Sequence, residues 1–201
     1  MDKRWDVLGL GCAAVDDALY VLRYPAGDTK IRVRRRQRRV GGLTAAALLA
    51  GARMGGRCAY AGKLGRDELS LFIEDELQRT GVDISPVVRV KEGSPIHAIV
   101  VLGDEDHTRT IFAYSDGTLG AHETLPAAEV IEAARVLFVD TYNVRGQWRA
   151  ARVARAADIP IVADFERGGG PPFEELQGLV DHLLLSLQFA PRWQGRGTPH
   201  A

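Results

Sequence analysis

The chain has 201 residues, of which 46% are hydrophobic and 26% are charged, so it is long enough to bury a core as one domain. Lys plus Arg and Asp plus Glu number 26 each, so no net charge draws the chain toward nucleic acid or an anionic membrane. No apolar run reaches the roughly 18 residues that a membrane span requires, and the polar start MDKRWD is unlike a signal peptide. We therefore expect a globular, cytoplasmic protein without a nucleic-acid or membrane partner.

The N-terminal region predicts two strands. The apolar run at residues 5–11 is typical of a buried strand, and the alternation in residues 16–25 predicts a second one. The segment GLGCAA, residues 9–14, also fits the dinucleotide-binding pattern G-x-G-x-x-A, which requires a helix directly after it. Because a strand is predicted there, a dinucleotide-binding oxidoreductase is the weaker alternative.

An arginine-rich strip, KIRVRRRQRRV, occupies residues 30–40 and contains six arginines. Ile31 and Val33 alternate with its charges, as in a strand with one apolar face. Charged side chains on such a strand protect its edge against pairing with other chains. Nucleic-acid binding is the alternative, but the strip has no aromatic residue that could stack on bases. We therefore expect an exposed edge strand.

The stretch VGGLTAAALLAGARMGG, residues 40–56, joins two glycines directly to a helix of small residues. Gly41 and Gly42 lack a Cβ, so they can adopt a positive φ and allow a ligand close to the backbone. Residues 43–54 predict a helix that Thr44 caps and that two further glycines end. Its first free N–H groups would face the ligand, which is typical of a binding floor. The alternative is an ordinary strand-to-helix turn of an α/β protein.

The middle of the chain adds a helix and further strands. An amphipathic pattern predicts a helix over residues 67–80. Strands are predicted at residues 57–62, 87–90, 97–102 and 108–114. GDEDH joins the last two as a hairpin, so an antiparallel patch interrupts the main sheet. We expect strands drawn from residues 17–40 and 97–114 to form a small β lid.

The second half returns to alternating helices and strands, typical of an α/β protein with a parallel sheet. Helices are predicted at residues 126–134, 146–157 and 173–180, and strands at residues 136–140, 159–164 and 182–186. Two of these strands end in an aspartate, Asp140 and Asp164, and ligands of open parallel sheets bind at the carboxyl ends of strands. An aspartate there also commonly caps the next helix, so both interpretations stay open.

The cysteines and the end of the chain carry less information. Cys12 and Cys58 lie in apolar contexts, which favours buried free thiols over a disulfide or a metal site. Residues 191–201 show no periodicity and are expected to form an irregular tail. The last predicted strand is followed by no helix that could cover it. We therefore expect residues 1–190 to form a domain that lacks its C-terminal part.

Taken together, these segments resemble the N-terminal two-thirds of the PfkB (ribokinase-like) carbohydrate kinases, over about residues 7–190. Residues 7–25 are similar to the family's first strand and the start of its lid. Residues 40–56 are similar to its Gly-Gly signature, which a helix of small residues follows. AGKLGRD, residues 61–67, and RTGVD, residues 79–83, are similar to two later motifs in the same order.

The resemblance implies a ribokinase-like parallel sheet flanked by helices, with a small β lid. It also implies ATP- and Mg²⁺-dependent transfer of phosphate to a hydroxyl of a small sugar or nucleoside. Asp16 corresponds to the acid that holds sugar hydroxyls in this family. The expected substrate-binding residues are Asp16, Gly41, Gly42 and Asp140, with Asp164 near the phosphate and the metal.

Three departures from the family pattern affect the expected activity. Ala46 stands where the signature usually has asparagine, as in members similar to sulfofructose kinase, which this chain resembles most. The segment SLQF, residues 186–189, replaces an Asn-x-x-Glu motif that helps to place Mg²⁺. The Gly-Ala-Gly-Asp motif with the catalytic aspartate has no counterpart in the 201 residues, nor has the ATP-binding third. We therefore expect no catalytic residue, no metal ligand, no bound ATP and no activity in this chain alone.

A non-catalytic sugar-binding or dimerising protein is the second hypothesis. Ile31, Val33, Ile99 and Val101 alternate with polar residues in the expected lid strands. A lid alone would leave this apolar face in water, which usually marks an interface. We therefore expect that the lid strands can pair two copies of the chain as a homodimer.

Overall fold

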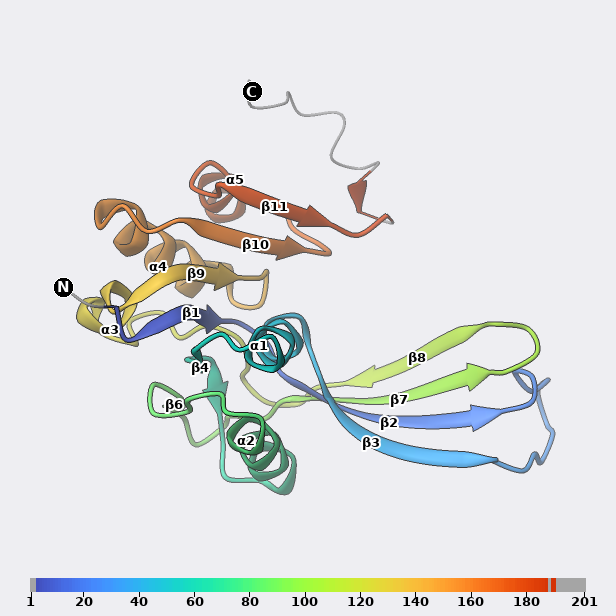
Figure 1. The fold of residues 1–201 in the computed structure, drawn as a ribbon. Helices are drawn as coiled ribbons and strands as arrows, with labels where there is room; N and C mark the ends of the chain where they lie inside the picture. The colour runs from blue at the N-terminus through green and yellow to red at the C-terminus, as the bar shows by residue number, and fades with distance from the viewer. Residues whose placement is uncertain (1–2, 188, 191–201) are drawn as a thin grey trace.

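The computed structural model describes residues 3–187 and 189–190, so the tail predicted at residues 191–201 lies outside the described residues (Figure 1). The strands are β1 (Trp5–Leu10), β2 (Ala14–Val21), β3 (Arg35–Gly41), β4 (Cys58–Tyr60), β5 (Lys63–Leu64), β6 (Val88–Arg89), β7 (Ile96–Gly103), β8 (Arg109–Tyr114), β9 (Ala134–Val139), β10 (Ile161–Phe165) and β11 (His182–Leu185). The helices are α1 (Leu43–Arg53), α2 (Glu68–Arg79), α3 (Ala128–Glu132), α4 (Val144–Ala156) and α5 (Pro171–Gln177).

The central sheet has the strand order β11-β10-β9-β1-β4, and all its neighbours run parallel. The strands predicted at residues 136–140 and 159–164 are therefore neighbouring parallel strands, β9 and β10, as expected. The short helices and loops between these strands follow from the alternating sequence pattern of the second half. The prediction of an α/β fold with a parallel sheet is confirmed.

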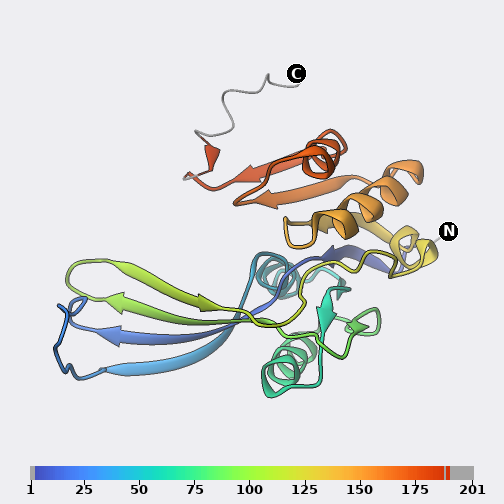
Figure 2. The same ribbon diagram turned by 180° about the vertical axis from the view of Figure 1, so that it is seen from behind.

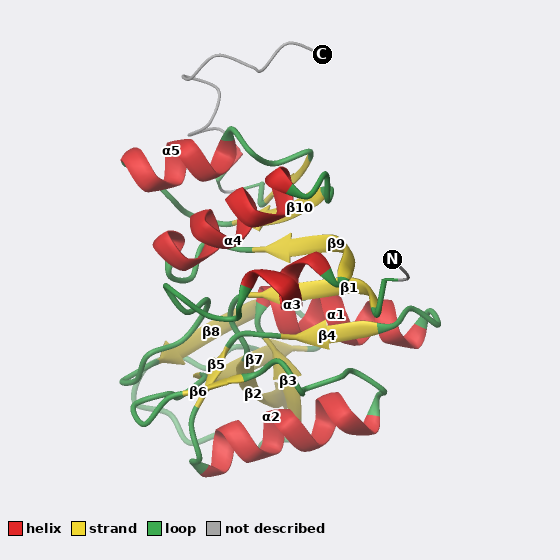
Figure 3. Cartoon of the chain, turned by 90° about the vertical axis from the view of Figure 1, so that its left-hand side faces the viewer, coloured by secondary structure: helices red, strands yellow, loops and turns green. Residues whose placement is uncertain are grey.

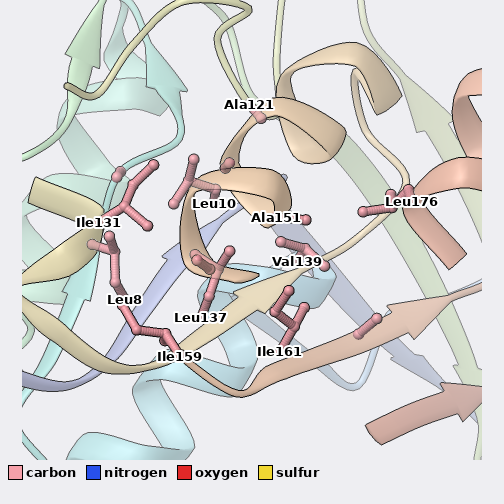
Figure 4. Packing of buried hydrophobic residues seen from close by; sticks show 14 of the residues in the cluster. Leu8, Leu10, Ala121, Ile131, Leu137, Val139, Ala151, Ile159, Ile161 and Leu176 are labelled. Carbon is pink, nitrogen blue, oxygen red and sulfur yellow. The ribbon is translucent and has the colours of Figure 1, made fainter. Parts of the chain in front are cut away.

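Helices cover both faces of this sheet (Figures 2 and 3). α3, α4 and α5 lie on one face, where Leu8, Leu137 and Ile161 from three neighbouring strands are fully buried (Figure 4). Ala151 of α4 packs in the same cluster, and its small side chain lets the helix lie close to the strands. Burying one such leucine or isoleucine stabilises the fold by about 1.5–3 kcal/mol.

A second buried cluster lies on the opposite face, under α1 and α2. Leu48 of α1 and Ile73 and Leu77 of α2 are buried there with Tyr60 of β4. Ile73 and Leu77 are four residues apart, which places both on the buried side of α2. This cluster packs α1 against the sheet and so positions the turn that precedes α1.

A second sheet of four strands, called the lid here, extends away from the central sheet (Figure 1). Its order is β3-β2-β7-β8. β2 pairs antiparallel with β3, and β7 pairs antiparallel with β8, but β2 and β7 are parallel. The predicted antiparallel hairpin of residues 97–102 and 108–114 is confirmed as β7 and β8. The strand predicted at residues 87–90 is not part of this patch, because β6 pairs parallel with β5. β2 and β7 are parallel because the chain reaches β7 by a long connection through α1 and α2 and not by a hairpin.

The lid corrects one sequence interpretation and confirms another. β3 begins at Arg35, so Ile31 and Val33 lie in the loop before it and not in a strand. Pairing between β2 and β3 ends at Tyr20 and Arg35, and within the described residues no strand pairs with Ile31 or Val33. The GLGCAA segment leads into β2 and not into a helix, so the dinucleotide-binding pattern lacks the context that it requires. Within residues 3–187, no helix combines the length and apolar character that a bilayer crossing requires.

Candidate functional site

The carboxyl ends of β1, β9 and β10 point toward the side of the sheet from which the lid extends (Figure 1). The Gly41–Gly42 turn between β3 and α1 lies at this junction. Gly42 has φ +84° and ψ 142°, a conformation that favours glycine. A Cβ at Gly42 would lie 2.8 Å from the Cα of Ala13 and 2.8 Å from the backbone nitrogen of Ala14. The sequence therefore needs glycine here for both backbone conformation and space.

Asp16 of β2 lies beside this turn. A Cβ at Gly41 would lie 2.3 Å from Oδ2 of Asp16, so the absence of a side chain at Gly41 makes room for the carboxylate. The carboxylate is half-buried, and no protein donor lies within hydrogen-bond distance of it in the part of the chain that the structure describes. Burial raises the pKa of Asp16, Arg109 opposes this shift, and Asp17 adds to it. The oxygens of the Asp16 carboxylate thus accept no hydrogen bond from the described residues.

Asp17, the next residue, is in the opposite situation. Its carboxylate accepts two hydrogen bonds from Arg38, at 3.0 Å from Nε and 2.9 Å from Nη2, and lies 2.9 Å from Nε2 of His97. Glu68 also pairs with Arg38, at 2.9 Å. The hydrogen bonds from Arg38 lower the pKa of Asp17 to about 2, despite its burial. Successive strand residues face opposite sides of a sheet, so Asp16 and Asp17 meet different surroundings.

Asp140 is fully buried just after β9 and joins three parts of the chain. It accepts hydrogen bonds from the backbone nitrogen of Cys12 at 2.7 Å and from Oγ1 of Thr44 at 2.8 Å. The backbone nitrogen of Tyr142 at 2.8 Å and Nε2 of Gln147 at 2.9 Å complete the set. The turn after β1, helix α1 and the start of α4 are therefore held together by one carboxylate.

Burial raises the pKa of Asp140 to about 6, and its hydrogen bonds oppose that shift. At neutral pH the group is therefore mostly ionised, and four donors compensate its charge. Its carboxylate has no exposed surface, so the structure places it below the surface of the candidate site. The alternative interpretation of Asp140 as the cap of the next helix is wrong, because Asn143 is the N-cap of α4.

Two expectations for the start of α1 are wrong. Thr44 does not cap the helix; Gly42 is the N-cap, and the Thr44 hydroxyl donates to Asp140 instead. The first N–H groups of α1 are not free either, since the nitrogen of Ala45 donates to the carbonyl oxygen of Cys12 at 3.2 Å. The N–H groups of Leu43 and Thr44 lower the pKa of the Cys12 thiol, although burial and Asp140 raise it overall. The dipole of α1 therefore faces Cys12, which the sequence did not indicate.

The sequence profile described as pfkB family carbohydrate kinase matches residues 8–184. The chain belongs to this family. A nucleoside kinase of Methanothermobacter thermautotrophicus is 25% identical over 156 residues, which cover 78% of this chain and 50% of that protein. The ketohexokinase of Mus musculus is 26% identical over 108 residues, which cover 54% of this chain and 36% of that protein. The chain thus spans at most half the length of these two relatives.

Solved structures agree with the pfkB assignment. A presumed ribokinase from Agrobacterium tumefaciens matches with a TM-score of 0.86 and 25% identity, over 98% of this chain and 64% of that one. The ribokinase of Arabidopsis thaliana, solved with ribose and ATP, matches with a TM-score of 0.78 and 21% identity, over 100% of this chain and 65% of that one. The expected ribokinase-like fold is confirmed. Members of this family are phosphotransferases.

In this pfkB-family chain, the position usually occupied by asparagine in the Gly-Gly signature is Ala46. Ala46 lies exposed in the first turn of α1, and its backbone nitrogen donates to the carbonyl oxygen of Gly42 at 2.9 Å. A methyl group therefore replaces an amide at this point of the surface. The position can add apolar contact but no side-chain hydrogen bond to a ligand.

Lys63 is a candidate site residue that the sequence interpretation did not single out. It is only 8% exposed, and within residues 3–187 no acceptor lies at hydrogen-bond distance from its ammonium group. Burial lowers its pKa, and Glu123 partly opposes this shift. The available signal was a lysine inside the apolar run AYAGKLG, since lysine is rarely buried without a partner.

Asp164 lies in β10 near the carboxyl end of the strand. Burial raises its pKa, and the neighbouring Glu166 adds to the effect. No group of three or more His, Cys, Asp or Glu side chains in the described part of the chain could hold a metal ion. Mg²⁺ in phosphate-binding sites usually has only one or two carboxylate ligands, with water and phosphate oxygens as the others.

Proposed function

We propose that this chain forms the acceptor-binding part of an ATP-dependent kinase that phosphorylates a hydroxyl group of a small sugar or nucleoside. The proposal rests on the surroundings of the Asp16 carboxylate. It is a half-buried carboxylate beside the Gly41 backbone, with no protein donor among the described residues. Asp17 and Asp140, by contrast, are fully engaged by donors of the fold. Adjacent sugar hydroxyls are donors that suit a free carboxylate.

The other expected residues divide into two roles under this proposal. Gly41 and Gly42 form the floor next to Asp16, and Asp140 holds that floor in position through Cys12 and Thr44. Phosphoryl transfer depends on positioning the acceptor and on stabilising the charge of the transferred group. Asp16, Gly41, Gly42 and Asp140 fit the first of these tasks, which is to position the acceptor.

We further propose that residues 1–201 bind the acceptor but do not transfer phosphate by themselves. Two observations support this: the 201 residues contain no Gly-Ala-Gly-Asp motif, and the chain covers 64% of the Agrobacterium tumefaciens structure. ATP would supply the phosphoryl group, with Asp164 on the side of the phosphate. The second candidate is a non-catalytic protein that binds sugar. It makes the same prediction, that Asp16→Asn weakens sugar binding.

Replacing Asp16 with asparagine is expected to weaken acceptor binding by about tenfold or more. Hydrogen bonds to a charged group contribute about 1.5–3 kcal/mol each, and about 1.4 kcal/mol corresponds to a factor of ten. Isothermal titration calorimetry with ribose, fructose and adenosine measures the effect, and thermal melts show that each variant is folded.

The matched control is Asp75→Asn, which changes an exposed acid on α2 that has no role in the proposed site. Gly41→Ala provides an independent second variant, because its Cβ would displace the Asp16 carboxylate and should weaken binding similarly. Equal affinity of the wild type and Asp16→Asn for a bound acceptor would show that the role of Asp16 is wrong. If none of the three acceptors binds the folded wild type, residues 1–201 do not form the proposed acceptor site.

We also propose that one face of the lid pairs with a second copy of the chain. Phe112 is 54% exposed and Tyr114 is 65% exposed, both on β8. Phe112 pairs across the sheet with Ile99, and Thr110 pairs with Val101, so the apolar side chains of Phe112, Ile99 and Val101 share one face. Such a face in water usually marks an interface.

The expected result is a dimer at micromolar concentration that Phe112→Asp converts to a monomer, measured by sedimentation velocity. A buried carboxylate without a partner would strongly oppose association at such a face. Leu71→Asp is the control, since Leu71 on α2 is also 54% exposed but lies away from the lid. A wild-type monomer, or equal dissociation by both substitutions, contradicts the proposal.

A further inference from the structure

A hollow of about 420 Å³ lies where β3, α1 and α2 meet, and four arginines line it. Arg38 and Arg39 come from β3, Arg53 comes from the last turn of α1, and Arg79 comes from the last turn of α2. Glu76 is the one acidic residue in its lining. The chain as a whole has no net charge, so this concentration of cations is local.

The arginines of this hollow differ in how they are paired. Arg79 pairs with Glu76, and Arg38 is held by Asp17 and Glu68. Arg39 donates to neutral groups, the hydroxyl of Tyr20 at 3.1 Å and the side chain of Gln37.

Arg53 has no acidic partner within the described residues. Two of the four guanidinium groups, those of Arg39 and Arg53, therefore have no carboxylate to neutralise them among residues 3–187 and 189–190. The C-terminal ends of the α1 and α2 dipoles favour Arg53 and Arg79. The cations brought together by three elements still repel one another, and a bound anion would reduce this repulsion.

The hollow extends away from the proposed acceptor site. Leu49 and Arg53, which line it, lie in the C-terminal half of α1, whereas the Gly42 turn precedes the first residue of that helix. A rise of 1.5 Å per residue places Arg53 roughly 15 Å from Leu43 along the helix axis. The Arg53 end of the hollow therefore lies away from an acceptor beside Asp16, whereas Arg39 at the other end pairs with Asp16 across the sheet.

We propose that this hollow binds a small multivalent oxyanion, such as the diphosphate group of a phosphorylated metabolite. The planar donor fork of arginine matches the oxygen geometry of phosphate, and several forks on one concave surface suit more than one phosphate group. The lining contains no aromatic residue on which a nucleic-acid base could stack, which favours a small ligand over a nucleic acid. The arginine-rich strip of the sequence thus contributes two residues to an anion site and is more than a protected strand edge.

Inorganic pyrophosphate is the probe, and isothermal titration calorimetry at low salt measures its binding. Arg53→Gln is expected to weaken binding at least tenfold, and Arg53→Gln with Arg79→Gln should weaken it further. The affinity of the wild type should fall as NaCl is raised, because salt screens the attraction. Arg38 is not substituted, because its loss would leave the buried Asp17 without its main partner.

Arg36→Gln is the matched control, since Arg36 lies on the same exposed strand but does not line the hollow. It makes the same change in charge and should alter the affinity less than twofold.

Three results would overturn the proposal. The first is no binding of pyrophosphate to the folded wild type at low salt. The second is equal weakening by Arg36→Gln and Arg53→Gln, which would indicate attraction by overall charge alone. The third is tighter binding of a single-stranded oligonucleotide, or of anionic vesicles, in competition with pyrophosphate, because the surface would then recognise a macromolecule.

Discussion

Replacing Asp140 with alanine is expected to lower the free energy of unfolding by about 3 kcal/mol or more, because it removes the acceptor of four buried donors. Leaving one buried donor without a partner costs about 1–3 kcal/mol. The donors are the backbone nitrogens of Cys12 and Tyr142, the Thr44 hydroxyl and the Gln147 amide. Removing the carboxylate also leaves a cavity at a fully buried position, which further lowers the free energy of unfolding.

Urea denaturation at pH 7.5 measures this loss, since the Asp140 carboxyl, with a pKa of about 6, is ionised there. Asp164→Ala is the matched control at the corresponding strand, β10. Asp164 is only partly buried and has no hydrogen-bond donor to its carboxylate within the described residues. Its replacement should change the free energy of unfolding by less than about 0.5 kcal/mol. Similar losses in the two variants would show that Asp140 does not hold β1, α1 and α4 together.

Gly42→Ala is expected to lower the free energy of unfolding by about 3 kcal/mol, from two separate causes. A residue with a Cβ in a sparsely populated backbone conformation costs about 1–3 kcal/mol. The new Cβ would also lie 2.8 Å from the backbone of Ala13 and Ala14, and overpacking typically costs about 1–3 kcal/mol. The neighbours are main-chain atoms, so no side chain can rotate to relieve the contact.

Gly55→Ala separates the two causes. Gly55 also has a positive φ, of +91°, but nothing lies within 4 Å of the position of its Cβ. Its replacement should cost only the backbone strain, about 1 kcal/mol. Thermal and urea denaturation of both variants measure the difference. A Gly42→Ala variant as stable as Gly55→Ala would mean that the turn can move away from Ala13 and Ala14.

The local pattern of the sequence determined the elements of this protein and their class. The apolar runs of β9 and β10, the helix spacing of α2 and the glycines around α1 are local signals, because each depends on neighbours within one turn or one strand. Such signals predict where helices and strands lie and that the sheet is parallel. The motifs and their order also indicated the family, because residues 40–56, 61–67 and 79–83 carry its pattern along the chain.

Only the tertiary structure decided what each candidate side chain contacts. Asp16, Asp140 and Asp164 look equivalent in the sequence as acids at or near strand ends. In the fold, Asp140 is enclosed by donors from residues 12, 44, 142 and 147, whereas Asp16 meets no donor in the described part of the chain. Partners up to 128 residues apart leave no local pattern, since their contact depends on how β1, α1 and α4 pack.

The same reason explains the errors at the start of α1 and in the lid. Thr44 has the residue type and position of a capping residue, but the distant Asp140 competes for its hydroxyl and binds it. Ile31 and Val33 alternate like strand residues, but in the part of the chain that the structure describes no strand pairs with them. Arg38, Arg39, Arg53 and Arg79 come together only because β3, α1 and α2 converge. Sequence patterning thus determined the elements and the family, and packing over long sequence distances decided which charges are satisfied and which are left for a ligand.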